Sequence, residues 1–592
     1  MSQQTAFTTI ISRVLSKPSV HITIILLSGL LAYANTFNVP FLFDDSRVIV
    51  DNYLIKNLGN LWPPTGTRWF GSLTFALNYA AGGLKVTGYH AVNLVIHLAA
   101  SLLVYRLVVL TFRTPFFAAE ERNTIREQTA GISALAAALL FVAHPIQTQA
   151  VTYIVQRYAS LATMLFLASI VCYIKARISH IRGAVRVSTL HKGAVAWYAV
   201  ALTCAVLAMK TKEIAFTLPF VIIIYECAFF PGRRLIERLC TLVPLALTLL
   251  IIPFTLLDIG SEGVLVPSQI MADISRHDYL LTQFRVIVTY LRLLILPVNQ
   301  MIDYVYPISR EFLEPSVFLS FLLLLALLLA SGLLLFLGGR GKVSPEFRIA
   351  GFGGLWFFIT LSVESSVIPI TDVIFEHRLY LPSAGMFMAV ASAGSVAVKH
   401  FDRRFPGSTG IMYAIISGIL VALPVATHFR NEVWHSGIAL WEDVASKSPD
   451  NARARAIIGI SLIEAKKIDE AIERFQEAIR IKPDYSDAII CLGNAYLEKG
   501  MLDEGYQQYL KALGLGTLDF ESQAQLMMNI GNYNLRKGLP DRAIYYFQNA
   551  LSLTPNMASI HYNLGQAYKA KGMTREAADE FTRARQLNPD RY

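Results

Sequence analysis

Apolar stretches long enough to cross a bilayer recur along the first 430 residues and constrain the fold more than any other feature of this sequence. Examples are residues 317–337 and 411–427, and no comparable stretch follows residue 427. The hydrocarbon core of a bilayer is about 30 Å thick, which a helix of about 20 apolar residues crosses. With 54% hydrophobic and only 16% charged residues, the chain is not an ordinary soluble globule. The sequence therefore predicts a helical membrane protein with several spans.

The net charge of +10 lies mainly in the membrane half. Residues 451–592 carry 18 Lys and Arg against 17 Asp and Glu, so the repeat region is nearly neutral. Basic loops on the cytoplasmic side of a membrane protein explain such an excess better than a nucleic-acid patch does. We expect membrane lipids, and no nucleic acid, as partners. The five cysteines show neither a disulfide framework nor the spacing of a zinc site.

Clusters of Lys and Arg divide the apolar stretches and predict how often the chain crosses the membrane. They lie at Arg13/Lys17, Arg113/Arg122/Arg126, Lys175 to Lys192, Arg233/Arg234/Arg238, Arg340/Lys342/Arg348 and Lys399/Arg403/Arg404. If each marks a cytoplasmic loop, two apolar stretches fit every gap between neighbours. The fourth gap holds a third candidate, residues 279–296, whose Gln283, Arg285 and Arg292 are costly at mid-bilayer. We interpret it as an interfacial or re-entrant helix and expect about eleven spans, with the N-terminus inside and the C-terminus outside.

This topology places the remaining polar segments on the outer face. These are FDDSR (43–47), HPIQTQAVTYIVQR (144–157), KTKE (210–213), QFRVIVTYLR (283–292) and ESSVIPITDVIFEHRLYLP (364–382). The sequence therefore predicts that they converge on one site, and that the C-terminal region lies on the same face.

Self-similar units follow residue 450 at the period of tetratricopeptide repeats. They start near residues 452, 486, 524 and 558, steps of 34, 38 and 34 residues. Small residues recur at Gly459, Gly493, Gly531 and Gly565, and aromatic residues at Phe475, Tyr509, Phe547 and Phe581. We therefore expect three parts: a transmembrane domain at 1–430, a linker helix at 431–450, and an α-solenoid of about four repeats at 451–592.

Stacked repeats form a groove that binds extended peptides or helices, so we expect the array to recruit a protein. A spacer or a dimerisation surface is the alternative, because the repeats specify a fold rather than a ligand.

Asp44 and Asp45 follow the first apolar stretch in a long outer loop. Adjacent carboxylates raise each other's pKa, which leaves one suited to accept a proton. A solvated or helix-capping Asp pair is the alternative.

Other charged and polar residues lie at the outer ends of apolar helices. They are His144, Gln156, Arg157, Lys210, Lys212, Glu213, Arg285, Arg292, Glu364, Glu376, His377 and Arg378. Snorkelling to the interface explains some of them. The clusters that mix both signs, 210–213 and 376–378, are more typical of helices that meet around an anionic group such as a phosphate.

At this point a resemblance to a known family can be stated. The strings FLFDD, RWFGSLTFALNYAAGG, YHAVNLVIHLAA, LLFVAHPIQTQAVTYIVQR, MKTKEIAFTLP, QFRVIVTYLRLLILP and WFFITLSVESSVIPITDVIFEHRLYLPSAG precede the repeats in that order. Together they resemble the transmembrane and tetratricopeptide-repeat O-mannosyltransferase family and its bacterial relatives. The array of about four units is shorter than in the animal members of that family.

The resemblance implies a GT-C type glycosyltransferase that takes a sugar, mannose or another hexose or pentose, from a polyprenyl phosphate carrier outside the cytosol. It implies an acidic general base in the first outer loop, which maps onto Asp44 or Asp45. That base deprotonates a Ser or Thr hydroxyl of an acceptor protein, and the sugar is transferred with inversion. No cofactor is required, because fixed cations stabilise the leaving phosphate.

For those cations we expect Arg378 with His377 first, then Lys212, Arg157 and Arg285. Supporting residues are His90, His144, Gln156, Glu213, Glu364 and Glu376. No metal site is assigned, although His90, His97 and His144 near two aspartates keep a divalent cation open.

Two functions of other classes compete with a transferase. A membrane scaffold or assembly factor would use the repeats without chemistry, and a flippase for lipid-linked sugars would carry charged or broken helices at mid-membrane. We expect a bacterial inner membrane with the repeats in the periplasm, or, as the alternative, an endoplasmic-reticulum membrane with the repeats in the lumen.

Overall fold

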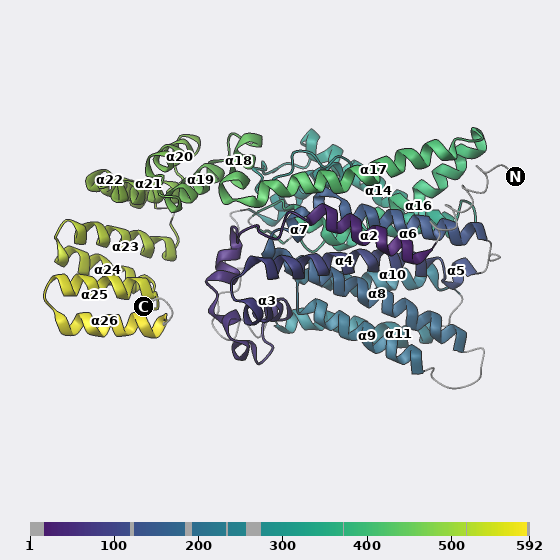
Figure 1. Cartoon of the computed structure of the whole chain (residues 1–592), viewed down its shortest axis with the longest axis horizontal. Helices are drawn as coiled ribbons and strands as arrows, with labels where there is room; N and C mark the ends of the chain where they lie inside the picture. The colour runs from purple at the N-terminus through teal and green to yellow at the C-terminus, as the bar shows by residue number, and fades with distance from the viewer. Residues whose placement is uncertain are drawn as a thin grey trace. The chain divides into compact units, whose positions relative to one another are not determined.

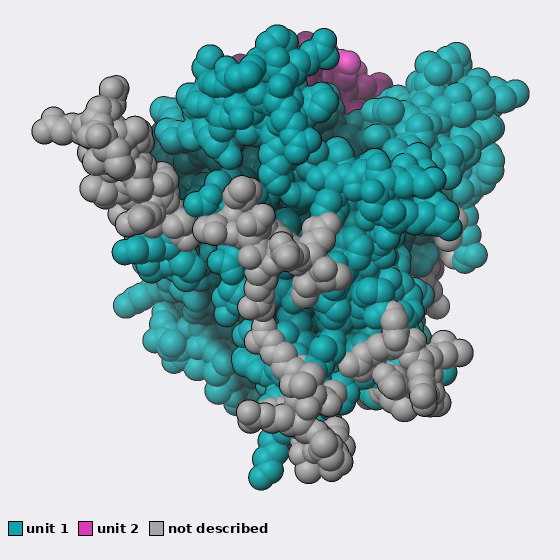
Figure 2. Space-filling view, turned by 90° about the vertical axis from the view of Figure 1, so that its right-hand side faces the viewer, with its two compact units in different colours: residues 1–302, 306–436 teal, residues 303–305, 437–592 magenta. Residues whose placement is uncertain are grey.

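The computed structural model describes residues 17–118, 124–183, 192–231, 235–255, 274–366, 368–370, 372–516 and 518–588. In these residues the chain is helical, without strands, and it forms two compact units. Unit 1 comprises residues 1–302 and 306–436, and unit 2 comprises residues 303–305 and 437–592, coloured teal and magenta in Figure 2. The predicted fold class, a helical membrane domain followed by a repeat solenoid, is confirmed. Several basic clusters used to count spans, including Arg13, Arg122, Arg233 and Arg234, lie outside the described residues.

A helix of unit 1 lies at each place where a span was expected. These helices are α2 (Pro18–Tyr33), α4 (Val86–Thr111), α6 (Thr124–Ala143), α8 (Arg157–Gly183), α9 (Lys192–Met209), α10 (Leu218–Phe229), α11 (Leu235–Ala246), α14 (Pro315–Gly339), α15 (Glu346–Leu361), α16 (Tyr380–Arg404) and α17 (Thr409–Glu432). Six helices of the described chain are long and apolar enough to cross a membrane, or seven if a bent pair around Pro145 counts as one span. Others are shorter; α10 has 12 residues and α15 has 16. The expected count of about eleven therefore exceeds the six or seven spans that length and hydropathy support.

Helix α8 lies at the centre of the bundle. Of its most apolar window 83% is buried inside the protein, against 11% for α14 and 6% for α17. Figure 1 shows the long helices running side by side. An apolar helix that exposes most of its surface, as α14 and α17 do, is stable only when lipid covers it.

The polar segments between the long helices meet at one end of the bundle, as the topology predicted. Thr427 at the end of α17 donates to the carbonyl of Ala143 at the end of α6 (2.6 Å), and Asn431 donates to the carbonyl of Ala32 in α2 (3.0 Å). In the same region Gln147 donates to Ser383 near the start of α16 (2.9 Å). Segments far apart in the sequence are therefore joined at this end.

Residues 279–296, expected as an interfacial or re-entrant helix, belong to α13 (Arg276–Ile295). This helix is not among the six candidate spans. Its Gln283 donates to the carbonyl of Val373 (2.9 Å), and its Arg285 donates to Ser309 (2.8 Å). Its polar side chains therefore bind neighbouring loops. Its depth in the membrane stays a prediction.

Unit 2 contains four helix pairs in its described part (Figure 1). They are α19 (Ala452–Glu464) with α20 (Ile468–Ile481), α21 (Ser486–Lys499) with α22 (Leu502–Gly514), α23 (Phe520–Arg536) with α24 (Pro540–Leu553), and α25 (Ala558–Ala570) with α26 (Thr574–Leu587). In each pair a glycine of the first helix lies against an aromatic ring of the second. An added Cβ would come within 2.5–2.8 Å of that ring at Gly459, Gly493, Gly531 and Gly565. The repeat prediction therefore describes how the helices pack.

The two units divide between Ser436 and Gly437, so α18 (Gly437–Lys447), expected as part of a linker, falls in unit 2. Residues 303–305 also belong to unit 2. The carboxylate of Asp303 accepts hydrogen bonds from Asn451 (2.9 Å) and Arg453 (3.2 Å). A division of the sequence at a single residue does not predict that residues 303–305 belong to unit 2.

Candidate active site

The loop after α2 gives Asp44 and Asp45 different environments. Asp45 is buried, and each of its carboxylate oxygens accepts a backbone hydrogen bond, from Leu42 N (3.0 Å) and from Val155 N (2.7 Å). Asp44 is exposed. Asp45 therefore ties the loop to Val155, whereas Asp44 is the carboxylate of the pair that solvent can reach.

The backbone just before this pair adopts a rare conformation. Phe43 has φ +51°, in the left-handed region that residues other than glycine seldom occupy. Such strain costs about 1–3 kcal/mol and persists only where the surrounding contacts enforce it. The two hydrogen bonds of Asp45 lie at this same turn, after which Asp44 is exposed and Asp45 is buried.

Burial also changes the acidity of Asp45. It raises the pKa of the Asp45 carboxyl to about 7, although the hydrogen bonds from Leu42 and Val155 favour the charged form. This pKa alone would suit a general base, but Asp45 is buried and both of its oxygens bind backbone N–H groups, so access and not acidity separates it from Asp44.

Tyr153, which the sequence analysis did not single out as a site residue, clamps Asp44. Its hydroxyl accepts the backbone N–H of Asp44 (2.8 Å) and also hydrogen-bonds the Asp44 side chain. Burial, followed by the charges of Asp45 and Asp44, raises the pKa of Tyr153 well above its usual range, so the hydroxyl keeps its proton. It can therefore donate to the Asp44 carboxylate throughout the physiological pH range.

Arg157 has a different role from the expected phosphate ligand. Its guanidinium is fully buried and donates to Asn93 Oδ1 (2.7 Å), to the carbonyl of Thr74 (3.2 Å) and to the carbonyl of Tyr89 (3.0 Å). It also lies over the ring of Phe75, 4.4 Å from the ring centre. Its donors are thus directed at the protein interior, where they join α8 to α3 (Trp69–Gly82) and α4.

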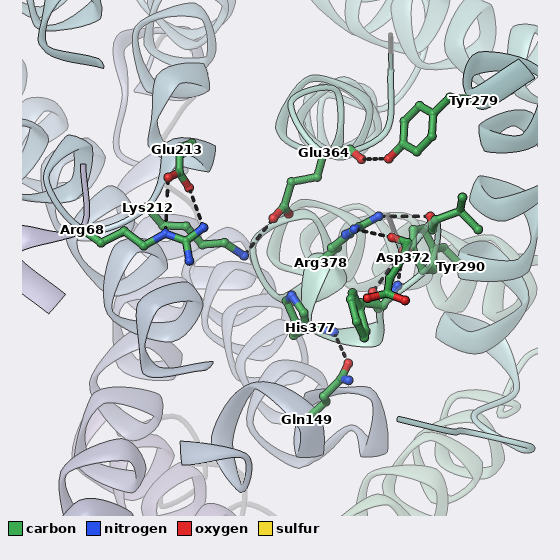
Figure 3. A network of polar contacts seen from close by, with 12 residues as sticks. Arg68, Gln149, Lys212, Glu213, Tyr279, Tyr290, Glu364, Asp372, His377 and Arg378 are labelled. Atoms are coloured by element: carbon green, nitrogen blue, oxygen red, sulfur yellow. Dashed lines mark hydrogen bonds and ion pairs between the residues drawn. The ribbon is translucent and has the colours of Figure 1, made fainter. Parts of the chain in front are cut away.

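A second group of residues forms what we call the cation cluster: Arg68, Lys212, His377 and Arg378 (Figure 3). Arg68 and Lys212 approach from one side and Arg378 from the other, with His377 between them. The charges of Lys212, Arg378 and Arg68 all disfavour a protonated His377. Sequence analysis predicted three of these four residues.

Carboxylates neutralise part of the cluster. Lys212 pairs with Glu364 (2.8 Å), and Arg68 pairs with Glu213 (3.3 Å). Arg378 instead donates to the main-chain carbonyls of Val373 (3.0 Å) and Asp372 (2.7 Å). Asp372 also lies beside Arg378 (Figure 3), so three cations meet three carboxylates and the cluster is a mixed-sign group.

The backbone around His377 is held from several sides. Its N–H donates to Gln149 Oε1 (2.7 Å), whereas its ring atom Nδ1 is buried and has no hydrogen-bond partner among the described residues. The neighbouring Glu376 accepts from Gln300 (2.8 Å) and from the N–H of Met301 (2.7 Å). Glu376 is therefore a structural acceptor, and the buried ring nitrogen of His377 is the group that still needs a partner.

One short segment connects the two groups. Gln149, in α7 (Thr148–Val151), binds His377, and Tyr153 binds Asp44. The four residues from Gln149 to Tyr153 span at most about 14 Å even when fully extended. Because α7 is helical, the real separation is shorter. A carboxylate and a cluster of cations therefore flank one region at this end of the bundle.

The remaining predicted residues do not join the cluster. Arg285 binds Ser309 and the carbonyl of Pro307 beside α13, and Gln156 is half-buried. Each imidazole of His90 and His144 contacts a main-chain carbonyl, of Val39 (2.8 Å) and of Leu294 (3.2 Å). These histidines brace loops. In the described part of the chain no group of three or more His, Cys, Asp or Glu side chains could hold a metal ion.

Two functional candidates escaped sequence reasoning, Tyr153 and Arg68. Both stand inside the strings that carried the family resemblance, but a lone Tyr or Arg in such a string gives no signal of its own. Arg68 could have been found by asking which cation neutralises Glu213, since both lie next to the ends of apolar helices.

The sequence matches known proteins along most of its length. Models described as TPR repeat match residues 459–500 and 536–572, and one described as Tetratricopeptide repeat matches residues 558–591. The human Protein O-mannosyl-transferase TMTC3 is 24% identical over 607 residues, covering 94% of this chain and 59% of that protein. The Drosophila melanogaster Protein O-mannosyl-transferase Tmtc3 is 25% identical over 569 residues, covering 82% of this chain and 58% of that protein.

The chain thus spans about three fifths of the length of the curated relatives it matches. Among solved structures, the crystal structure of MamA aligns with 26% of this chain and 87% of its own, with 21% identity and a TM-score of 0.23. Both the membrane helices and the repeats lie inside the region shared with the mannosyl-transferases. The chain matches the TMTC-like family of membrane proteins with tetratricopeptide repeats.

Proposed function

We propose that this protein is an integral membrane glycosyltransferase that moves a sugar from a polyprenyl phosphate carrier to a Ser or Thr hydroxyl of an acceptor protein. One observation carries the proposal. Within a single short segment, Tyr153 binds the exposed Asp44 and Gln149 binds His377 of the cation cluster. The relatives named protein O-mannosyl-transferases support mannose as the first sugar to test. Another hexose or a pentose is the alternative.

Asp44 is the general base in this proposal. It is exposed, whereas Asp45 is buried and bonded to two backbone N–H groups. Tyr153 fixes the backbone and the side chain of Asp44, so that a carboxylate oxygen can be aimed at an incoming hydroxyl. General base catalysis requires this kind of positioning before it requires a particular pKa.

The cation cluster stabilises the leaving phosphate. In the donor the phosphate is a diester with one negative charge, and the released polyprenyl phosphate carries more. Charge that grows during the reaction is stabilised best by fixed donors, such as Arg378, Lys212 and the buried ring nitrogen of His377. The carboxylates of Glu364 and Glu213 hold Lys212 and Arg68 in place until the phosphate binds.

The chemical step balances without any further reactant. The acceptor oxygen forms a bond to the anomeric carbon as its proton passes to Asp44. The bond between the anomeric carbon and the phosphate oxygen breaks, and its electron pair stays on the phosphate. The configuration at the anomeric carbon inverts. We also propose that no divalent cation is needed, so that EDTA leaves the transfer rate unchanged.

The repeats recruit the acceptor protein in this proposal. Their helix pairs match the tetratricopeptide pattern, a scaffold that binds peptides. A bacterial inner membrane, with the repeats in the periplasm, is the proposed setting, and an endoplasmic-reticulum membrane with the repeats in the lumen is its eukaryotic equivalent.

The test is transfer by purified full-length protein, with polyprenyl phosphate mannose as donor and a Ser/Thr-rich acceptor peptide. Asp44→Asn is expected to lower kcat by about 10²- to 10⁴-fold, because the base is lost. Asp51→Asn is the matched control, since Asp51 is an exposed carboxylate of the same loop. Unchanged transfer in Asp44→Asn would refute the catalytic role. No transfer by the wild type with any lipid-linked sugar would favour the scaffold or the flippase.

A further inference from the structure

The last two turns of α17 carry an unusual number of hydrogen bonds to the ends of other helices. Thr427 donates to Ala143 O (2.6 Å), and His428 Nδ1 contacts Leu31 O (3.1 Å). Asn431 donates to Ala32 O (3.0 Å). Most of α17 is exposed, and its buried residues are Pro424, Thr427 and Asn431. The polar side chains are therefore concentrated where the helix ends, just before the repeats begin.

These contacts hold both chain segments that form the proposed base site. Ala32 lies at the end of α2, which leads directly into the loop of Asp44. On the other side, Thr152 donates to Asn431 Oδ1 (2.6 Å), and Thr152 is the neighbour of Tyr153. Asn431 thus bridges the two segments that must keep their register for Tyr153 to reach Asp44.

Trp434 completes this arrangement by packing on Tyr153 itself. The indole and phenol rings have centres 5.8 Å apart and planes inclined by 31°. Trp434 is only 1% exposed, and its Nε1–H has no hydrogen-bond partner in the described structure. The indole therefore contributes shape and not a hydrogen bond. A buried ring that leaves its polar atom unsatisfied is costly, and such a cost is retained where the shape matters.

We propose that Asn431 and Trp434 are positioning residues for the transfer reaction, acting through Tyr153 on the Asp44 carboxylate. The inference rests on the proposed function and extends it from the base to the helix end that aims the base. Trp434 fixes the ring plane of Tyr153, the Tyr153 hydroxyl fixes the backbone and carboxylate of Asp44, and Asn431 keeps α2 and residue 152 in register. Displacement of a catalytic group by about 1 Å is enough to lower a rate about 100-fold.

A purely structural role makes a different prediction. If Trp434 only filled space, its removal would lower the yield and the thermal stability of the protein but leave the turnover of each folded molecule unchanged. If it positions the base, turnover must fall while binding of the donor persists, because His377 and Lys212 of the cation cluster are held by Gln149 and Glu364, which lie outside α17.

The experiment uses full-length protein and four variants: Trp434→Ala, Trp434→Phe, Tyr153→Phe and the control Phe429→Ala. Phe429 lies in the same part of α17 but is 62% exposed. For Trp434→Ala we expect kcat to fall about 100-fold with KM for the donor lipid within about two-fold. Trp434→Phe keeps an aromatic ring on Tyr153 and should recover most of kcat. Phe429→Ala should match the wild type.

Hydrogen exchange of backbone amides gives a second readout that does not depend on activity. The Asp44 amide is protected by Tyr153, and the Val155 amide is protected by Asp45. In Trp434→Ala both amides should exchange about 10-fold faster or more. In Tyr153→Phe only the Asp44 amide should exchange faster. Faster exchange in Trp434→Ala, together with lower kcat, supports the proposal. Unchanged exchange and unchanged kcat overturn it.

The two proposals fail in distinguishable ways. If the wild type transfers no sugar, the proposed function fails, and the exchange of the Asp44 amide alone decides whether Trp434 positions the loop. If the wild type transfers sugar and Trp434→Ala does so equally well, the positioning role fails and the function stands.

Discussion

The ion pair between Lys212 and Glu364 allows the stability of the cation cluster to be separated from its function. The two side chains are 7% and 14% exposed, and their charged atoms lie 2.8 Å apart. Removing one partner of such a buried pair leaves an unpaired charge and costs about 3–5 kcal/mol of stability, whereas removing both is often nearly neutral. Loss of one donor to the developing phosphate charge should cost about 10²- to 10³-fold in kcat.

These magnitudes predict that stability and activity respond differently in the double variant. Lys212→Met should lower both the thermal midpoint of the purified protein and its kcat. The double variant Lys212→Met/Glu364→Gln should regain the thermal midpoint, because no charge is left unpaired, but not the activity, because the phosphate still lacks its donor. Both quantities are measured on the same detergent-solubilised preparations, with the transfer assay described above.

A second ion pair in the same bundle is the matched control. Lys399 and Glu346 are also 2.8 Å apart, but they join the start of α15 to the end of α16, away from His377. Lys399→Met should lower stability without lowering kcat. The reasoning is refuted if the Lys212/Glu364 double variant regains activity along with stability, since Lys212 would then be only a structural partner.

Two further predictions concern the loop and the repeats. Since burial raises the pKa of Asp45 from 3.8 to about 7, the folded loop binds a proton that the unfolded chain has released, and its stability should fall by about 4 kcal/mol as pH rises from about 4 to about 7. An infrared titration should show a carboxyl with a midpoint near pH 7 that disappears in Asp45→Asn and persists in Asp44→Asn; a band unaffected by Asp45→Asn would contradict this. In the repeats, Gly531→Ala places a Cβ 2.5 Å from the ring of Phe547 and should cost about 1–3 kcal/mol in urea denaturation of residues 437–592. The control Gly514→Ala meets nothing within 4 Å, and a cost there as large as at Gly531 would show that ring packing is not the cause.

The sequence was sufficient to predict two parts of the fold, the repeats and the long apolar helices. Long apolar stretches predict helices because lipid leaves the backbone no other hydrogen-bond partners. The glycine and aromatic positions of the repeats predict packing because one glycine faces one ring in every pair. The span count is less certain, because helices such as α10 and α15 lie where spans were expected but are short, and a count by basic loops takes no account of length.

The sequence predicted which types of residue form the site, but not how their side chains are arranged. Mixed-sign clusters at helix ends correctly brought Lys212, His377 and Arg378 together. The same signal included Arg157 and Arg285, because a sequence does not show that these two guanidinium groups bind carbonyls and a hydroxyl away from His377. The sequence also did not show which of Asp44 and Asp45 is exposed and which is buried. Their difference depends on the backbone N–H of Val155, more than a hundred residues away, and on the strained φ of Phe43.

The position of the end of α17 has a consequence for the kinetics of the proposed reaction. The chain leaves unit 1 just after Trp434, which packs on Tyr153, so the proposed acceptor on the repeats would be linked through one continuous chain to the proposed base site. Such a tether turns the second encounter into an intramolecular one, with an effective concentration of the order of millimolar for a short linker. This depends only on where the chain is attached. A weakly bound acceptor with several Ser and Thr residues would then receive several sugars before it dissociates.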